Sequence, residues 1–339
     1  MTEDFSIRSI PLQYASDLRE LKGFLAEHGL RFEKDIETAF GVFDGEDRLL
    51  GCGCGAGPVL KCFAVAQELR GQNALGPLLS ALEQDRFQRG FYDLSVITRT
   101  GNVPLFTACG FFLTAGTKEI AMLENRPDGP ETFAGKLWQA GDENRTVGAV
   151  VLNGNPFTLG HRYLIETASG QCDALHVFVV EEDRSFFPSG DRLDMVREGT
   201  EDLPNVRVHP SGRYMISAAT FPTYFLREEK DAARLQSELD AALFAGRIAP
   251  ALHITKRFAG KEPLDPVTAG YNRALSGILP SNGIEFVEIA RLEKDGGPVS
   301  ASRVRALLKE KGLCPEVMAL VPPVTQRYLV DRFGEGHGF

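Results

Sequence analysis

The sequence predicts a two-domain α/β protein, with a mixed, largely antiparallel first domain and a parallel-sheet second domain. The chain has 339 residues, which is too long for one ordinary core and suits two. From Val147 onward, strand and helix patterns alternate regularly, as in a parallel α/β sheet. A stretch rich in Pro, Gly and charged residues separates the two patterns. We therefore expect a first domain at residues 1–130, a linker at 131–146 and a second domain at 147–339.

Short strands and amphipathic helices alternate in the first third. Period-two or apolar runs predict strands at residues 5–10, 39–44, 48–57, 59–66, 92–98 and 111–116. Apolar residues at helical spacing predict helices at residues 14–28, 74–90 and 103–110.

Near-continuous apolar runs mark the strands of the second domain. VGAVVLNG, which starts at Val147, is typical of a strand covered on both faces. The same pattern predicts strands at residues 147–154, 174–182, 205–210, 251–256 and 284–290. Helices are expected from Leu159 and at residues 189–203, 228–245, 267–279 and 300–311, several of them opened by a capping Ser or Asp.

Composition excludes several functional classes. The chain is 43% hydrophobic and 24% charged, with a formal net charge of −9 and no long basic run, which argues against nucleic acid as the main partner. No apolar run is long enough to span a bilayer, and the N-terminus does not resemble a secretory signal, so we expect a cytoplasmic protein. The six cysteines are scattered without a CxxC pair, which favours free thiols over a metal site.

The first candidate site lies where the first strand of the second domain meets its helix. Residues 153–158 occupy the turn, at the carboxyl end of a parallel strand, where ligands bind. The helix N-terminus offers free N–H groups to a phosphate, Gly160 allows close backbone approach, and His161 lies in the first turn. A Gly-His pair by itself favours a core histidine, or simply a polar residue at a helix start, over a functional site.

A second strand-to-helix junction strengthens the hypothesis. VSASRVRALL, Val299 to Leu308, follows the last predicted strand after a loop. Ser300 and Ser302 can cap a helix, and Arg305 projects about one turn further on. Together the two junctions form a credible ATP site, with hydroxyls and a guanidinium to hold the polyphosphate.

Other loop residues are weaker candidates. Arg192 opens the helix after the second strand of this domain, and Gly260 and Glu262 follow the fourth strand, where they would reach the adenosine. Ordinary helix-face or loop roles explain these residues equally well, as they do for Lys256 and Arg257. The full predicted ATP-binding set is Asn153, Asn155, Pro156, Phe157, Thr158, Gly160, His161, Arg192, Gly260, Glu262, Ser300, Ser302 and Arg305.

The paired motifs resemble those of the nucleotidyltransferase superfamily, whose signatures are (H/T)xGH and ISxTxxR. They read here as Thr158-Leu159-Gly160-His161 and as Val299 to Arg305. Longer strings, including NGNPFTLGHRYLIE, SGRYMISAATFPTYFLRE and FAGKEPLDPVTAGYN, resemble the citrate lyase ligase family over residues of about 147 to 331. This resemblance implies a Rossmann-like parallel sheet for the second domain.

The first domain resembles the GNAT acetyltransferase fold. YDLSVITRTGNVPLFTACGFF is similar to its late motif, with Asn102, Phe106 and Gly110 in the expected places. In the expected pyrophosphate loop Arg70 matches, but Asn73 and Leu75 stand where small residues would let amides wrap a phosphate. Two roles stay open for this domain: docking of a pantetheine-containing arm, or a purely structural part.

The resemblance implies an acid–thiol ligase that uses ATP, carried in with Mg²⁺, and acetate. Its partner would be the citrate lyase acyl carrier subunit, whose phosphoribosyl-dephospho-coenzyme A arm carries the thiol. By this resemblance His161 and Arg305 are the catalytic residues: His161 stabilises the α-phosphate during formation of acetyl-adenylate. Thr158 holds phosphate oxygens, and Ser300, Ser302 and Arg305 hold the β- and γ-phosphates. The alternatives are a small-molecule adenylyltransferase that acts on a phosphorylated cofactor precursor, and a nucleotide-binding regulator without catalysis.

Overall fold

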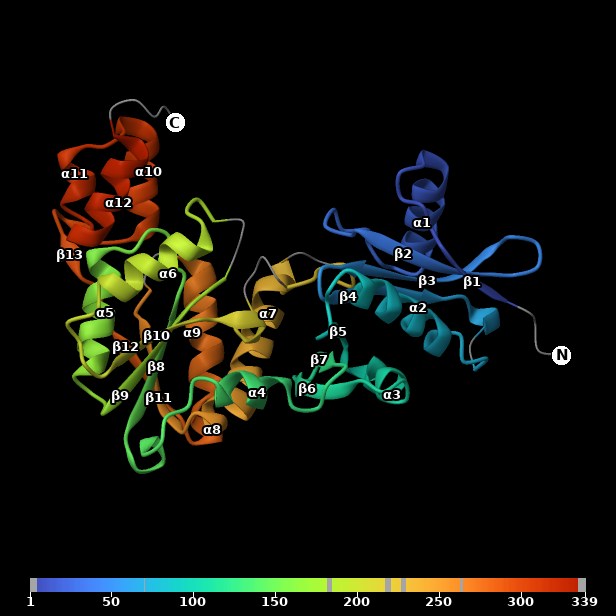
Figure 1. The fold of residues 1–339 in the computed structure, drawn as a ribbon, viewed down its shortest axis with the longest axis horizontal. Helices are drawn as coiled ribbons and strands as arrows, with labels where there is room; N and C mark the ends of the chain where they lie inside the picture. Colours follow the sequence, from blue (N-terminus) through green and yellow to red (C-terminus); the bar gives the residue numbers. More distant parts are fainter. Residues whose placement is uncertain are drawn as a thin grey trace. The chain divides into compact units, whose positions relative to one another are not determined.

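The computed structural model of the protein describes residues 5–69, 71–181, 185–216, 221–226, 230–262 and 265–334. The chain forms two compact units, residues 1–129 with 221–239, and residues 130–220 with 240–339 (Figure 1). No helix in the described part of the chain is long and apolar enough to cross a bilayer.

A seven-stranded sheet with the order β1-β2-β3-β4-β5-β7-β6 builds the first unit. Its neighbours pair antiparallel, except for β4 and β5, which are parallel. The strands are β1 (Ser6–Ser9), β2 (Thr38–Phe43), β3 (Leu49–Ala56), β4 (Val59–Val65), β5 (Ser95–Arg99), β6 (Phe112–Gly116) and β7 (Ile120–Glu124). The helices are α1 (Ala15–Glu27), α2 (Leu75–Gln88) and α3 (Val103–Thr107), with 3-10 turns at Gln67–Leu69 and Thr100–Asn102. This topology confirms the predicted mixed first part.

Strand β7 is absent from the predicted elements. All of its residues are buried, so it lacks the period-two alternation by which a half-exposed strand is recognised. Its antiparallel partner β6 agrees with the strand predicted at residues 111–116.

The parallel ladder between β4 and β5 is short, and a tyrosine from much later in the sequence lies where it stops. The two strands pair only at Val59 with Ser95 and at Leu60 with Val96. Tyr224 is buried, and its Oη donates a hydrogen bond of 3.1 Å to the backbone oxygen of Ile97, the next residue of β5. The gap left by the ladder is therefore occupied by the protein's own side chain.

The segment around Tyr224 is held by polar contacts from both flanking strands. The N and Oγ1 atoms of Thr223 donate to one carboxylate oxygen of Glu33 at 2.7 and 2.9 Å. The other oxygen of Glu33 accepts from the buried Lys61 of β4 at 2.9 Å. Arg99 of β5 donates to the backbone oxygen of Phe225 at 2.8 Å. Residues 221–226 are thus an integral part of the first unit. Arg70 of the expected pyrophosphate loop lies outside the described residues.

The second unit is built on a five-stranded, fully parallel sheet with the order β10-β9-β8-β11-β12. Its strands are β8 (Val147–Leu152), β9 (Ala174–Val179), β10 (Val206–Pro210), β11 (Ile254–Gly260) and β12 (Glu285–Ile289). A small hairpin, β13 (Glu293–Lys294) with β14 (Gly297–Pro298), follows β12. The parallel sheet confirms the predicted fold class of the second part.

Helices connect and cover these strands. They are α4 (Gly129–Gly135), α5 (Leu159–Ser169), α6 (Ser189–Glu198), α8 (Ala249–Ala251), α9 (Pro266–Ile278), α10 (Ala301–Lys311), α11 (Pro315–Met318) and α12 (Pro323–Phe333). Helix α7 (Lys230–Leu243) begins in the residues of the first unit and ends in those of the second. Short turns lie at Asp142–Asn144, Gly212–Tyr214 and Pro280–Asn282, and a π-helical turn at Phe244–Ile248 joins α7 to α8.

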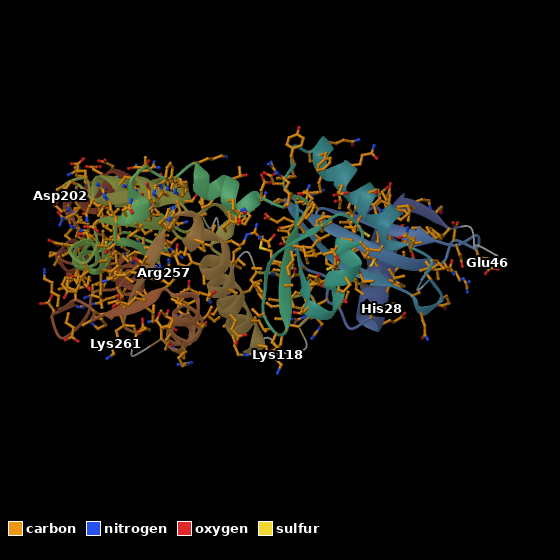
Figure 2. All side chains as sticks on the ribbon, turned by 90° about the horizontal axis from the view of Figure 1, so that it is seen from below. His28, Glu46, Lys118, Asp202, Arg257 and Lys261 are labelled. Atoms are coloured by element: carbon orange, nitrogen blue, oxygen red, sulfur yellow. The ribbon has the colours of Figure 1, made fainter. Side chains whose placement is uncertain are left out.

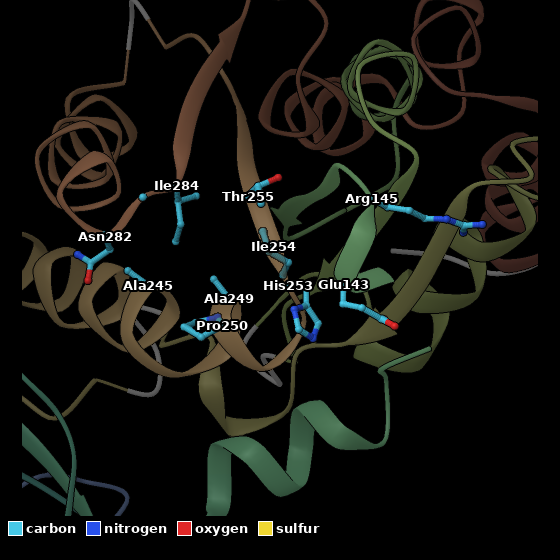
Figure 3. Close-up of a pocket in the computed structure, with 11 residues that line it drawn as sticks. Glu143, Arg145, Ala245, Ala249, Pro250, His253, Ile254, Thr255, Asn282 and Ile284 are labelled. Atoms are coloured by element: carbon cyan, nitrogen blue, oxygen red, sulfur yellow. The ribbon is translucent and has the colours of Figure 1, made fainter. Parts of the chain in front are cut away.

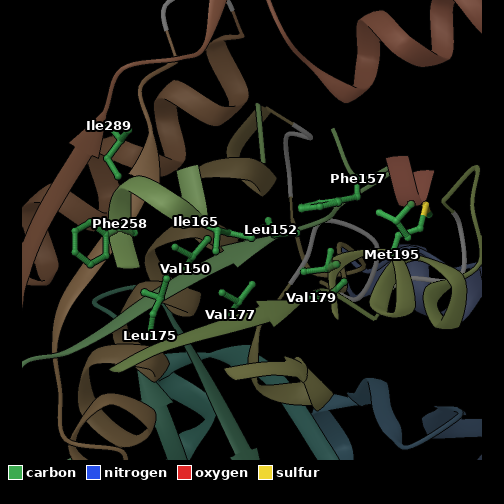
Figure 4. Packing of buried hydrophobic residues seen from close by; sticks show 13 residues of the cluster. Val150, Leu152, Phe157, Ile165, Leu175, Val177, Val179, Met195, Phe258 and Ile289 are labelled. Atoms are coloured by element: carbon green, nitrogen blue, oxygen red, sulfur yellow. The ribbon is translucent and has the colours of Figure 1, made fainter. Parts of the chain in front are cut away.

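Two apolar clusters hold the second unit together. The first joins the inner strands to α5 and α6, and includes Val150, Val177, Phe258 and Ile165 (Figure 4). The second packs α10, α11 and α12 on one another around Phe187 and Val299. Burial of a large aliphatic side chain contributes about 1.5–3 kcal/mol to the stability of the fold, so these clusters stabilise the strands and helices that carry the loops.

Three features of the second unit differ from the predicted elements. The stretch predicted as a linker contains the helix α4. Strand β11 begins at Ile254 and ends at Gly260, later than predicted, because Ala249–Ala251 still belong to helix α8. The last helices, α11 and α12, were not predicted; each opens at a proline, which is well tolerated in the first turn of a helix.

Candidate functional site

The carboxyl ends of four neighbouring strands form one edge of the parallel sheet. Leu152 at the end of β8 pairs with Val179 of β9, and Gly260 of β11 pairs with Ile289 of β12. Strands β8 and β11 also pair in the same direction. Residues that follow these strand ends therefore lie along one edge, which we call the carboxyl edge, and where parallel sheets bind ligands.

A capping box at the start of α5 orients His161. Thr158 is the N-cap residue, and its Oγ1 accepts a hydrogen bond of 3.3 Å from the backbone N of His161. In return the backbone N of Thr158 donates to Nδ1 of His161 at 3.1 Å. Because Nδ1 accepts a backbone N–H, the neutral ring carries its proton on Nε2, which is then available as a donor.

The surroundings of His161 favour the neutral form. Its ring stacks on the buried Phe157 at a centroid distance of 6.0 Å and an interplanar angle of 9°. Burial, followed by the charges of Arg291 and Arg305, lowers the pKa of His161 to about 4. In the absence of an anion the site thus holds a neutral imidazole, on which the charges of two guanidinium groups act.

Gly160 lies against the backbone of the loop before α10. A Cβ atom added to Gly160 would stand 2.4 Å from the backbone oxygen of Val299. The sequence analysis assigned this glycine to close approach of a ligand, whereas the structure places the Val299 carbonyl next to its Cα. The amide N–H of Gly160 has no hydrogen-bond partner among the described residues, while those of Thr158, Leu159 and His161 are bonded. That amide is the free donor of the helix N-terminus.

The second motif forms the N-terminus of α10 beside the first. Ser300 is the N-cap residue and its Oγ accepts from the backbone N of Arg303 at 3.2 Å. The hydroxyls of Ser300 and Ser302 lie 3.1 Å apart. Arg305 donates through Nη1 to the backbone oxygen of Asn155, and burial lowers the pKa of its guanidinium. The structure thus brings together two motifs that lie about 140 residues apart in sequence.

Arg192 supports the site from behind. It is fully buried, and its Nη1 donates to the backbone oxygens of Asn153 and Val180 and to Oδ1 of Asn153. The predicted contact of Arg192 with ATP is therefore not supported by its position; its charge orients Asn153, which is exposed at the carboxyl edge. Asn155 is buried and accepts from the backbone N of Phe187 at 3.1 Å.

Pro156 and Phe157 are also buried, and they shape the turn rather than line an open surface. The backbone oxygen of Phe157 accepts from Oγ1 of Thr325 on α12 at 2.9 Å, which anchors the turn to the C-terminal helices. Both residues thus belong to the scaffold that fixes Thr158 and His161.

On the other side of β8, Glu262 forms an ion pair that the sequence analysis did not anticipate. Its carboxylate accepts from Nη2 of Arg291, which lies two residues beyond the end of β12. Gly260 is the last residue of β11, and its oxygen accepts from Asn272 at 3.1 Å. Arg291 was missed as a site residue, although it follows a predicted strand at the carboxyl edge as the chosen candidates do.

Lys256 and Arg257 lie within β11 and not beyond it, because this strand extends to Gly260. Figure 2 labels Arg257 among the side chains of the second unit. Lys256 pairs with Glu285 at 3.3 Å. Arg257 is 2% exposed, and its guanidinium stands 4.6 Å from the ring centre of Phe244. Neither residue is placed among the loops of the carboxyl edge.

A pocket of about 300 Å³ opens at the opposite edge of the sheet (Figure 3). Its lining includes Arg145, His253, Ile254 and Ile284, which precede or begin strands β8, β11 and β12. It is therefore separate from the motifs. Among the described residues no group of three or more His, Cys, Asp or Glu side chains could hold a metal ion, and the six cysteines are free.

The arrangement at the carboxyl edge suits a polyanion. The N-termini of α5 and α10 meet where Gly160 lies against Val299, and the charges of Arg305 and Arg291 both act on His161. Helix N-termini bind phosphate through free amides and the helix dipole, and guanidinium groups add charged hydrogen bonds. Such a site can hold a nucleoside triphosphate and stabilise charge that develops on it.

Comparison with known proteins identifies relatives over nearly the whole chain. Residues 147–329 match the family model described as the citrate lyase ligase C-terminal domain. The [citrate [pro-3S]-lyase] ligase of Klebsiella pneumoniae is 43% identical over 313 residues, 91% of each chain. That of Escherichia coli K12 is 39% identical and covers 92% of this chain and 90% of its own. A phosphopantetheine adenylyltransferase from Dehalococcoides mccartyi is 36% identical over 67 residues, 19% of this chain and 42% of its own.

Solved structures match parts of the chain. TmcAL of Thermotoga maritima, crystallised with alpha-thio ATP, matches with a TM-score of 0.38 and 16% identity over 57% of each chain. An acyl-CoA N-acyltransferase described as putative, from Klebsiella pneumoniae, matches with a TM-score of 0.29 and 19% identity, over 35% of this chain and 95% of its own.

Proposed function

The chain belongs to the citrate lyase ligase family, an enzyme family, and on that premise we propose that it acetylates the prosthetic-group thiol of citrate lyase with ATP and acetate. The observation that carries the proposal is the meeting of the Thr158–His161 and Ser300–Arg305 motifs at one edge of the parallel sheet. The proposed partner is the acyl carrier subunit of the lyase, with its phosphoribosyl-dephospho-coenzyme A arm.

In the first step a carboxylate oxygen of acetate attacks the α-phosphorus of ATP. The bond to the β-phosphate oxygen breaks, so pyrophosphate leaves and acetyl-adenylate forms. No covalent bond to the protein is needed, and catalysis consists of positioning and charge stabilisation. His161 donates from Nε2 to an α-phosphate oxygen, and the Gly160 amide holds the same end of the triphosphate. Thr158, which the sequence predicted to hold phosphate oxygens, is fully buried and instead orients His161 through the capping box.

The second motif binds the leaving group. Ser300, Ser302 and Arg305 contact the β- and γ-phosphates, and Arg305 is pre-oriented by its bond to the oxygen of Asn155. Mg²⁺ enters with ATP, bound to phosphate oxygens and water, as Mg²⁺ commonly is in such sites.

In the second step the thiol of the arm attacks the carbonyl carbon of acetyl-adenylate. The thiol proton is released, the bond to the adenylate oxygen breaks, and AMP leaves as the thioester forms. A thiol of ordinary pKa, about 8.5, is mostly protonated at neutral pH, so a local base would accelerate this step.

The proposal is tested by incubating the protein with deacetylated citrate lyase, ATP and acetate, followed by an assay of citrate cleavage. Recovery of lyase activity that requires both ATP and acetate, with stoichiometric AMP, is the expected result. Absence of recovery with a lyase that chemical acetylation does reactivate would overturn the proposal.

The second candidate is adenylyl transfer to a phosphorylated cofactor precursor. The local similarity to a phosphopantetheine adenylyltransferase favours it over other nucleotidyl transfers. The two are separated by ATP–pyrophosphate exchange: acetate-dependent exchange supports the ligase, whereas turnover of ATP with phosphopantetheine and not with acetate supports the adenylyltransferase.

A further inference from the structure

Arg291 is fixed at the carboxyl edge by two neighbours from the loop after β11. Its Nε donates to the backbone oxygen of Lys261 at 3.1 Å, and its Nη2 donates to the carboxylate of Glu262. The Glu262 side chain is 4% exposed, while that of Arg291 is 28% exposed. Among the described residues Nη1 of Arg291 has no hydrogen-bond partner. The guanidinium is therefore anchored on one side and open to solvent on the other.

The backbone brings Arg291 close to the first turn of α5. The next residue, Leu292, accepts through its backbone oxygen a hydrogen bond of 2.9 Å from the backbone N of Val299. The backbone oxygen of Val299 in turn lies 2.4 Å from the position that a Cβ atom on Gly160 would take. Val299 thus contacts both Leu292, which follows Arg291, and Gly160, which precedes His161.

Electrostatics agree with this geometry. The charge of Arg291 is the foremost charged contribution that lowers the pKa of His161, ahead of that of Arg305, and burial contributes most. The groups that face Arg291 are the carboxylate of Glu262 and, further off, that of Asp265, whose pKa Arg291 helps to lower. Arg291 thus acts on His161 although no hydrogen bond joins the two side chains among the described contacts.

We propose that Arg291 is a third anion-binding residue of this site, that it contacts the α-phosphate beside His161, and that Glu262 positions it. The proposal deepens the proposed function and rests on it only in that the site binds ATP. Arginine suits this task because its planar guanidinium can donate to a carboxylate and to a phosphate at the same time. Glu262, expected from sequence to contact the adenosine, is thereby assigned to orienting Arg291.

The arrangement also links nucleotide binding to the protonation of His161. In the free protein the two guanidinium groups disfavour an imidazolium. A bound α-phosphate neutralises this positive field, so the pKa of His161 rises when ATP binds. The imidazole then becomes a stronger donor at the moment when the phosphate gains charge in the transition state.

Four variants of the full chain test the proposal: Arg291→Gln, Arg291→Lys, Glu262→Gln and, as a matched control, Arg327→Gln. Arg327 pairs with Glu198 on the surface of α12 and is 60% exposed, so its loss changes net charge equally without touching the carboxyl edge. Acetate-dependent ATP–pyrophosphate exchange should fall about 100-fold in Arg291→Gln and about tenfold in Arg291→Lys, and should be unchanged in the control.

A second readout separates this role from a merely structural one. The pKa of His161, followed by NMR in the nucleotide-free protein, should rise above about 4 in Arg291→Gln but stay below the ordinary value of about 6.5, because burial and Arg305 still lower it. It should stay low in Arg291→Lys, which keeps the charge. Addition of α,β-methylene-ATP to the wild-type protein should raise the same pKa.

The outcomes are decisive in each case. Exchange within threefold of wild type in Arg291→Gln, or a His161 pKa that does not respond to loss of the charge, would overturn the proposal. If Arg291→Gln fails to fold in a thermal melt, Arg291→Lys and Glu262→Gln decide in its place, since both should lose exchange and keep the wild-type melting temperature. If the wild type shows no exchange with acetate, the proposed function fails, while the His161 titration with α,β-methylene-ATP still judges Arg291.

Discussion

Gly160→Ala tests whether the two motifs are held together by backbone contact. The added methyl group would stand 2.4 Å from the Val299 oxygen and 3.4 Å from its carbonyl carbon. An ordinary contact of this kind is about 3.4 Å, so the N-terminus of α5 and the loop before α10 must separate by about 1 Å. The obstacle is backbone, and it cannot swing away as the end of a flexible side chain could.

The magnitude follows from two opposing effects. Alanine in place of glycine favours the helix by about 1 kcal/mol, whereas forcing an extra carbon into a packed contact costs about 1–3 kcal/mol. The net loss of stability is therefore small, about 0–2 kcal/mol. The site is more sensitive, because a displacement of about 1 Å of positioned groups can cost about 100-fold in rate.

The assay is ATP–pyrophosphate exchange with acetate, measured beside thermal unfolding. Gly277→Ala in α9 is the matched control, since a Cβ there would meet nothing within 4 Å. The control should keep full activity and gain up to about 1 kcal/mol. Wild-type exchange in Gly160→Ala at an unchanged melting temperature would refute the inferred contact with Val299.

Three further predictions follow from particular side chains. His161→Ala should lower ATP–pyrophosphate exchange about 100-fold or more because a donor to the transition-state phosphate is lost; turnover equal to wild type would contradict the proposed role. Tyr224→Phe removes the hydrogen bond to the Ile97 oxygen and should lower the free energy of unfolding in urea by about 0.5–1.5 kcal/mol, and no change would mean that the phenol contributes nothing to the gap between β4 and β5. Nδ1 of His176 lies 2.9 Å from Nε2 of His209, and burial lowers the pKa values of the two rings to about 3 and about 4. Below about pH 6.5 the unfolded chain therefore binds more protons than the folded one, so the free energy of unfolding should decrease as pH falls, by up to about 1.4 kcal/mol per pH unit for each ring. The double variant His176→Gln, His209→Gln should flatten this dependence in urea titrations at several pH values.

The gap between β4 and β5 bears on the role of the first unit. Tyr224 fills the space where the ladder stops and is bonded to β5, while its backbone oxygen accepts from the N of Arg31 at 2.9 Å. An elongated arm could enter the same space only after this side chain leaves. The structural role for the first unit therefore needs no rearrangement, whereas docking of a pantetheine arm in that gap would require one.

Much of the fold could be predicted because local patterns carry it. Apolar runs marked the buried parallel strands, and the elements at 75–88, 147–152 and 301–311 agree closely with their predicted ranges. Predictions failed where local signals are weak, as in β7, whose uniformly buried residues show no alternation, and in β11, whose start is shifted by a preceding helical turn. These are cases in which tertiary burial, and not periodicity, decides the element.

For the candidate site, the sequence by itself determined the helix cap at Ser300, because a hydroxyl at the N-cap bonds to an amide only three residues away, that of Arg303. Thr158 caps α5 by the same short-range bond to His161, although the sequence pointed only to a phosphate contact for it. Only the tertiary structure decided the rest: that Gly160 meets a carbonyl instead of a ligand, that Arg192 is buried behind the loop, and that residues 221–239 belong to the first unit. It likewise paired Arg291 with Glu262 at the carboxyl edge. The physical reason is that caps and periodicities are short-range, whereas these contacts join residues that lie far apart in sequence, such as 39 positions for Arg192 with Asn153 and 139 for Gly160 with Val299, and depend on the path of the chain between them.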